Sequence, residues 1–145
     1  MLSIKNLNVS IGNVSILRGI NVQVPDQKFI GLIGRNGAGK TTLMRTIIGL
    51  LSHHQGEILF ENQIISPTKP AFVRANLGIG YMPEDRRLVP DLSVKENILM
   101  TAWATKKDFP EQKLDNIYEM IPELCDLSTR KASLLSGGQQ KIVSL

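Results

Sequence analysis

The sequence predicts an α/β fold in which a β-rich N-terminal part is followed by a strand–loop–helix unit and then by a helical segment. Three observations predict it. Residues 2–24 alternate polar and apolar side chains, residues 28–33 form a short apolar run, and residues 41–51 repeat apolar side chains at helical spacing. At 145 residues, the chain has the length of one domain with unequal β and helical parts.

The expected elements follow one another along the chain. Residues 2–10 and 14–24 are predicted to be strands joined by a hairpin turn at Gly12-Asn13. The apolar run 28–33 is predicted to be a buried central strand, and 41–51 a helix packed on one face. Further predicted elements are a strand–turn–strand over 56–65, a second core strand over 78–82, and helices over 94–107 and 111–124.

Composition excludes several classes of protein. Hydrophobic residues make up 42% and charged residues 21%, which supports a globular core. The net charge is +4, but Lys and Arg are spread along the chain and aromatic residues are 5%, so we expect no nucleic-acid partner. No apolar run approaches the roughly 18 residues of a membrane-spanning helix. The N-terminus lacks the pattern of a secretory signal, so the chain is expected in the cytosol.

A glycine-rich loop carries the strongest functional signal. Residues 34–41 match G-x-x-x-x-G-K-[ST] without deviation, between a predicted buried strand and an amphipathic helix. Glycine at 34, 37 and 39 is expected to allow backbone conformations that turn N–H groups toward phosphate oxygens, with Lys40 on the β- and γ-phosphates and Thr41 on Mg²⁺. The residues expected to bind ATP are Gly34, Arg35, Asn36, Gly37, Ala38, Gly39, Lys40, Thr41 and Thr42.

A second glycine motif lies far downstream, at Leu135, Ser136, Gly137, Gly138 and Gln139. By itself it predicts a turn and a helix cap. Together with the phosphate loop it closely resembles the ATP-binding domain of ABC transporters, whose signature is L-S-G-G-Q. The resemblance implies that these five residues complete the ATP site of a second ATP-binding subunit in a head-to-tail dimer. It also implies a P-loop NTPase (RecA-like) core, an N-terminal antiparallel β subdomain and a helical subdomain.

The resemblance covers essentially the whole chain. It places the β subdomain and P-loop core at about 1–82 and the helical subdomain, with the signature, at about 83–145. Residues 80–84 resemble the Q-loop, and the pattern from Pro83 to Asn97 is similar to that of branched-chain amino-acid importer ATPases; sugar-importer ATPases share parts of it. Implied partners are transmembrane permease subunits, faced by residues 86–105, with the protein peripheral on the inner face of the cell membrane.

Two positions depart from the family pattern. Ile11 stands where most relatives place an aromatic residue that stacks on adenine, so we expect apolar contact with the base without the stacking energy. Packing within the hairpin is an equally good interpretation of Ile11. Glu84 replaces the usual Q-loop glutamine; its carboxylate can meet Mg²⁺ but cannot donate as an amide does.

The adjacent histidines His53 and His54 are expected to be solvated loop residues. The family's Mg²⁺-associated aspartate, catalytic glutamate and switch histidine follow the signature helix, and a central strand beside the phosphate-loop strand comes with them. None of these lies within residues 1–145, so the fold is expected to be incomplete at its C-terminus, with no catalytic residue beyond a Q-loop role for Glu84. The isolated chain is therefore expected not to turn over ATP.

Three functional hypotheses follow. In the first, the chain is the N-terminal part of an importer ATPase that couples ATP binding and hydrolysis to solute uptake, with branched-chain amino acids as the expected substrate. In the second, it is a nucleotide-binding module that does not hydrolyse ATP and exposes a sheet edge that favours pairing with another chain. In the third, it is a non-transport ABC ATPase, which the missing basic stripe and missing heptads disfavour.

Overall fold

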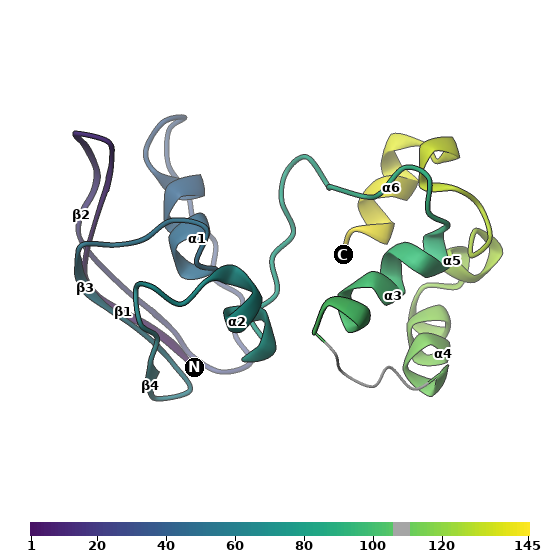
Figure 1. The fold of residues 1–145 in the computed structure, drawn as a ribbon, viewed down its shortest axis with the longest axis horizontal. Helices are drawn as coiled ribbons and strands as arrows, with labels where there is room; N and C mark the ends of the chain where they lie inside the picture. The colour runs from purple at the N-terminus through teal and green to yellow at the C-terminus, as the bar shows by residue number, and fades with distance from the viewer. Residues whose placement is uncertain (106–110) are drawn as a thin grey trace. The chain divides into compact units, whose positions relative to one another are not determined.

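A computed structural model describes residues 1–105 and 111–145, which form two compact units, Met1–Gly80 and Tyr81–Leu145 (Figure 1). The first unit contains, in order, β1 (Leu2–Ile11), β2 (Val14–Val24), α1 (Lys40–Ile47), β3 (Gln55–Phe60), β4 (Gln63–Ile64) and α2 (Ala71–Asn76). The second contains α3 (Val94–Thr105), α4 (Glu111–Met120), α5 (Pro122–Asp126), the 3₁₀ turn η1 (Ala132–Leu134) and α6 (Gly137–Val143). Within the described ranges, every helix falls short of the length and apolarity needed to cross a membrane.

An antiparallel sheet in the order β2-β1-β3-β4 forms one layer of the first unit (Figure 1). The predicted hairpin and the predicted strand–turn–strand over 56–65 are both confirmed. Inward-facing side chains of the sheet pack with Leu43 of α1 in one apolar cluster, so the helix that begins at the phosphate loop is held on the sheet. The buried members of that cluster are Ile4, Leu7, Val9, Leu17, Leu43, Ile58 and Ile65.

A bulge in β1 interrupts the predicted strict alternation. The buried Leu7 lies three positions after the buried Ile4, and the pairing with β2 shifts between them. Asn6 lies between them in the left-handed region, with φ of 47°. The extra residue lets Ile4 and Leu7, three positions apart, both face the core. In a regular strand, side chains three positions apart point to opposite faces.

Two asparagine side chains replace backbone hydrogen bonds at this bulge. Asn8 Oδ1 accepts from the Gly19 N–H (2.9 Å) and its amide donates to Asn6 O (2.8 Å). Asn21 Oδ1 accepts from the Asn6 N–H (2.9 Å) and its amide donates to Gly19 O (2.8 Å). The backbone N–H and C=O groups of Asn6 and Gly19 therefore stay paired at the bulge, although both residues are exposed.

Neither predicted core strand forms. Residues 28–33 and 78–82 have no regular structure, and Phe29 and Ile33 are 106% and 95% exposed. A strand exists only through hydrogen bonds to a neighbouring strand, and the described part of the chain supplies no partner for either run. For residues 28–33 the predicted burial is therefore wrong as well, because the whole run is exposed.

The helical predictions in the second unit need one correction. Residues 111–124 are not one helix, because α4 ends at Met120 and α5 begins at Pro122, whose ring and missing N–H interrupt the helical ladder. The predicted helix over 94–107 is observed as α3 up to Thr105; residues 106 and 107 lie outside the described ranges. The core of this unit consists of buried residues of α3, α5, η1 and α6, and of the residues that directly follow α5 and η1: Val94, Leu124, Leu127, Ala132, Leu135 and Val143.

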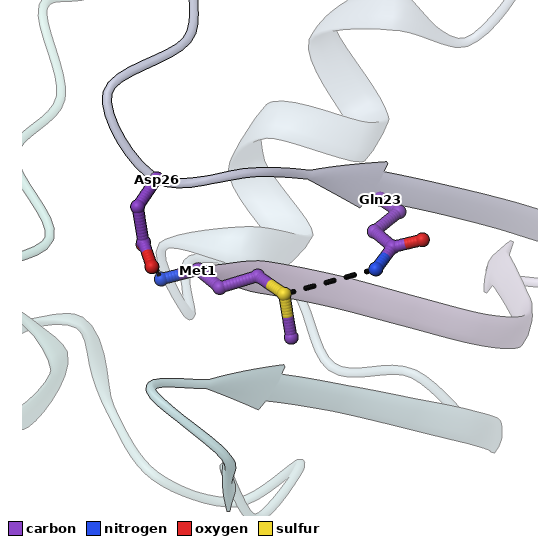
Figure 2. Close-up of polar contacts among 3 residues, drawn as sticks. All are labelled: Met1, Gln23 and Asp26. Carbon is purple, nitrogen blue, oxygen red and sulfur yellow. Dashed lines mark hydrogen bonds and ion pairs between the residues drawn. The ribbon is translucent and has the colours of Figure 1, made fainter.

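The N-terminus is attached to the end of β2 (Figure 2). The α-amino group of Met1 forms an ion pair with the Asp26 carboxylate, and Met1 Sδ accepts a hydrogen bond from Gln23 Nε2 at 3.7 Å. Both contacts are exposed, so we expect them to contribute little to stability.

A buried arginine that the sequence analysis missed stabilises the end of α1. Arg74, on α2, is 1% exposed and donates to the carbonyls of Thr46 and Ile47 at 2.9 and 2.8 Å. It also donates to Lys69 O and Ser66 O. A cation at a helix C-terminus satisfies carbonyls that have no partner within the helix and interacts favourably with the helix dipole.

His53 corrects the expectation that both histidines are solvated, because it is 7% exposed while His54 is exposed. Neither ring nitrogen of His53 has a hydrogen-bond partner. Burial lowers the pKa of the imidazole below its usual 6.5, the backbone of Gln55 acts in the opposite direction, and the charge of Arg74 lowers the pKa further. His53 is therefore held neutral beside a buried guanidinium.

Gly56→Ala tests the close approach of β3 to the bulge. Gly56 has φ of 91°, and a Cβ there would lie 2.4 Å from Asn6 O. We expect the free energy of unfolding in urea to fall by about 3 kcal/mol from the combined strain and overlap. Gly78→Ala is the control, because Gly78 has φ of 95° but nothing within 4 Å of the added Cβ; it should lose about 1 kcal/mol. Equal losses would contradict a role for the contact.

Acidification tests the burial of His53. Because the folded state has the lower pKa, the unfolded chain binds more protons once pH falls below about 6.5. The free energy of unfolding should therefore be largest above pH 6.5 and decline as pH drops from 7 toward 5. His53→Leu should remove part of this slope, whereas the matched His54→Leu should keep it. Parallel curves for His53→Leu and the parent protein, from urea unfolding at several pH values, would show that His53 is not responsible.

Candidate functional site

The phosphate loop connects an unpaired segment to the start of α1. Residues 34–38 are exposed, and the helix begins at Lys40. Gly37 and Gly39 have φ of 81° and 89°, in the left-handed region that favours glycine. Gly34 has no such φ, so the expectation of special backbone freedom holds for two of the three glycines.

Lys40 folds back across this loop. Its Nζ donates to Gly34 O at 2.7 Å and to Arg35 O at 2.9 Å. The Ala38 N–H also donates to Arg35 O, at 3.1 Å, which closes a tight turn. An ammonium group has three N–H donors, so Lys40 can keep both carbonyls and still point one donor at an anion. The predicted phosphate-binding lysine is therefore placed over the loop.

The first turn of α1 has free capacity to bind an anion. Its N-cap is Gly39, which supplies no side-chain hydrogen bond, so the first N–H groups of the helix lack a side-chain acceptor. Thr41 is exposed and Thr42 half-buried in this turn. An uncapped helix N-terminus beside an ammonium group and a hydroxyl is the donor set that triphosphates require.

The predicted magnesium ligands lie in different units. Thr41 is in the first unit and Glu84 in the second, where it is exposed. Among the described residues, no group of three His, Cys, Asp or Glu side chains is arranged to hold a metal ion.

Ile11 ends β1 and pairs with Val14 across the hairpin turn. Its side chain is 49% exposed, so a large apolar surface remains available to a ligand. Arg35 and Asn36 are exposed in the loop itself. Both interpretations of Ile11, contact with a base and packing in the hairpin, therefore stay predictions.

The signature loop (residues 135–139) forms the capped start of α6 in the second unit. Ser136 is the N-cap: its hydroxyl accepts from the Gln139 N–H at 3.2 Å, and the Gln139 side chain accepts from the Ser136 N–H at 3.1 Å. This reciprocal pair is a capping box. The Ser136 hydroxyl proton is not used by it, so Ser136 can still donate to an acceptor outside the helix.

Other contacts hold the signature loop to its surroundings. Leu135 is buried in the core of the unit, while Ser136, Gly137 and Gly138 are exposed. The Gln139 amide donates to the Glu123 carboxylate on α5 at 3.3 Å. The loop thus has a buried base and an exposed tip, the arrangement that presents backbone N–H groups to a ligand.

Asn97 is a buried residue that positions the segment before α3, a role that its place in the Pro83–Asn97 pattern did not reveal. It is 5% exposed; its Oδ1 accepts from the Val89 N–H at 2.8 Å, and its amide reaches the carbonyls of Val89, Leu92 and Ser93. It therefore fixes the segment that leads from Glu84 into α3. The sequence did hold a signal for this role, because a polar residue at a core position of a predicted helix indicates a buried hydrogen-bonding group.

The comparisons with known proteins identify the chain's family. The family model described as ABC transporter matches residues 17–145. The chain belongs to the ABC transporter family. It is 30% identical over its whole length to a probable branched-chain amino acid transport ATP-binding protein, LivF, of Archaeoglobus fulgidus, covering 61% of that protein. It is 31% identical to the lipopolysaccharide export system ATP-binding protein LptB of Haemophilus influenzae, again covering 61%.

Solved ABC cassettes share the fold. The dimeric structure of the bacterial cassette MJ0796 matches 99% of this chain with a TM-score of 0.81 at 22% identity, and the chain covers 67% of that cassette. The predicted P-loop NTPase class, with its N-terminal antiparallel sheet and its helices, is therefore confirmed. This ABC transporter family chain spans about three fifths of the length of the two curated relatives.

Ser136→Ala tests the capping role of the signature serine. Loss of the cap should lower the free energy of unfolding of the second unit by about 1 kcal/mol. Urea unfolding monitored by circular dichroism measures this change. Ser133→Ala is the matched control, since Ser133 is exposed and does not cap a helix in this way. An unchanged midpoint in Ser136→Ala would show that the capping box is dispensable.

Proposed function

We propose that the chain is the nucleotide-binding part of an ABC importer ATPase, which couples ATP binding and hydrolysis to the uptake of branched-chain amino acids. The observation that carries the proposal is the phosphate loop, with Lys40 folded over Gly34 and Arg35 and an uncapped helix behind it. These groups fit a triphosphate by charge and by hydrogen-bond type.

The residues of the loop have separate tasks. Lys40 stabilises phosphate charge, the N–H groups of the loop and of the first turn of α1 donate to phosphate oxygens, and Ile11 offers apolar surface to the base. Thr41 is the proposed ligand for Mg²⁺, which when bound neutralises phosphate charge and lowers the cost of charge development during transfer. Glu84 is proposed as a second contact to Mg²⁺ or to water. Orientation and charge neutralisation are the two contributions that phosphoryl transfer demands of a protein.

The signature loop is proposed to act on the ATP of a second ATP-binding subunit in a head-to-tail dimer. Its exposed tip and the free Ser136 hydroxyl proton support this, as does the likeness in fold to a cassette solved as a dimer. Transmembrane permease subunits are the proposed membrane partners, faced by residues 86–105, with the chain peripheral on the inner face of the membrane. Boundaries near 82 and 83 for the β-core and helical subdomains are part of the same proposal.

The proposed substrate class is supported by one of the relatives named above. A branched-chain amino acid transport protein and a lipopolysaccharide export protein are similar to this chain at 30% and 31% identity. The pattern from Pro83 to Asn97 favours the amino-acid importers.

In source cells carrying Lys40→Ala, uptake of labelled leucine, isoleucine and valine should fall, while uptake of a pentose should not. Loss of pentose uptake alone would assign the chain to a sugar importer.

A second candidate is nucleotide binding without hydrolysis. It is favoured by the apolar segment 28–33, whose Phe29 and Ile33 are exposed instead of forming part of a core sheet. Phosphate release from MgATP discriminates the two: sustained release by the 145-residue chain would exclude the second candidate.

Lys40→Ala tests the proposed nucleotide site directly. Removing the ammonium group should weaken the binding of a fluorescent ATP analogue, with Mg²⁺, by about tenfold or more, since a hydrogen bond to a charged group contributes roughly 1.5–3 kcal/mol. Lys95→Ala, an exposed lysine in the other unit, should bind as the parent protein does. Equal affinity of Lys40→Ala and the parent would overturn the proposed site.

A further inference from the structure

The turn that carries Glu84 has an unusual backbone. Arg86 and Arg87, two consecutive residues other than glycine, have φ of 60° and 50°. The Arg86 N–H donates to Pro83 O at 3.1 Å, and the Arg87 guanidinium returns to the Asp85 carboxylate at 3.0 Å. Left-handed backbone at such residues persists where surrounding contacts hold it. We call residues 83–87 the Glu84 turn.

Arg86 connects this turn to the helix of the signature. Its guanidinium donates to Gln140 Oε1 at 3.0 Å, across 54 positions of sequence, in a partly buried hydrogen bond. The same guanidinium lies 3.6 Å from the point where a Cβ on Gly137 would stand. Arg86 therefore contacts α6 both through a hydrogen bond and over the glycine of its first turn.

Gln140 also forms hydrogen bonds to residues at and before the start of the signature loop. Its amide donates to Leu135 O at 3.3 Å and to Ala132 O at 3.4 Å, and its N–H donates to Ser136 O at 2.9 Å. With the amide nitrogen committed to two carbonyls, the Oε1 atom must face Arg86. A chain of hydrogen bonds thus runs from the Glu84 turn through Gln140 to Leu135 and Ser136, at the start of the signature loop.

We propose that Arg86 is a positioning residue that couples the Glu84 turn to the signature loop through Gln140, so that a displacement of either one shifts the other. This inference rests on the proposed function, which gives both segments a part in the nucleotide sites. Arg87, although adjacent and of the same charge, pairs with Asp85 inside the turn and does not serve this purpose.

Hydrogen exchange measures the coupling without any nucleotide. In Arg86→Ala, amides of residues 136–140 should exchange roughly tenfold faster, a change typical of losing one charge-assisted hydrogen bond. Gln140→Ala should accelerate exchange in the Glu84 turn, and the double variant should add little to Gln140→Ala, because both remove the same link. Arg86→Lys keeps a cationic donor and should restore most of the protection. Arg87→Ala is the matched control and should leave residues 136–140 unchanged.

Nucleotide measurements separate positioning from loss of stability. Arg86→Ala should keep the parent affinity for the fluorescent ATP analogue at the phosphate loop, while about tenfold more MgATP is needed to drive self-association in sedimentation experiments. Arg86→Lys should reverse that shift.

Unchanged exchange at residues 136–140 in Arg86→Ala, or the same change in Arg87→Ala, overturns the coupling. If Arg86→Ala fails to fold, hydrogen exchange in Arg86→Lys and in the near-isosteric Gln140→Met tests the coupling instead. If the parent protein binds no nucleotide, the proposed function fails, whereas the exchange result still decides the role of Arg86.

Discussion

The pairing of backbone hydrogen-bonding groups determines which segments of this chain become regular structure. The β1–β2 pair survives a bulge because Asn8 and Asn21 supply the donors and acceptors that the ladder loses at Asn6 and Gly19. The equally apolar segment 28–33 stays outside the sheet because no strand within the described residues pairs with it. Burial of apolar area favours a compact chain. A segment can be buried only if its backbone N–H and C=O groups find partners, because burying unpaired polar groups costs free energy.

The same constraint distinguishes the two glycine motifs. At α1 the helix N-terminus has no side-chain cap, and its donors remain available for phosphate oxygens. At α6 the capping box of Ser136 and Gln139 satisfies the helix internally, leaving a hydroxyl proton and an exposed loop. An open donor set suits direct phosphate binding, and a rigid, self-capped loop suits presentation to a neighbouring site.

Side chains far apart in sequence complete the supports. Arg74 satisfies the carbonyls at the end of α1, so the helix behind the phosphate loop is held at its C-terminus by a buried charge of the first unit. In the second unit, Asn97 and the Arg86–Gln140 pair hold the segment after Glu84 against α3 and α6. These polar contacts position the loops that an apolar core alone would leave free to shift.

Local sequence signals were enough to predict the hairpin, the strand pair over residues 55–64, the phosphate loop with its helix, and the helix start at Ser136. Each depends on local periodicity, turn residues or spacing within about ten residues, and these are visible in one dimension. The break before α5 was also visible, because Pro122 stands in the sequence. The bulge at Asn6, the burial of Arg74 and His53, the exposure of Phe29 and the Arg86–Gln140 contact required the three-dimensional structure. These four depend on which segments find a partner in space, and hydrogen-bond pairing over long sequence separations leaves no periodic trace in the chain.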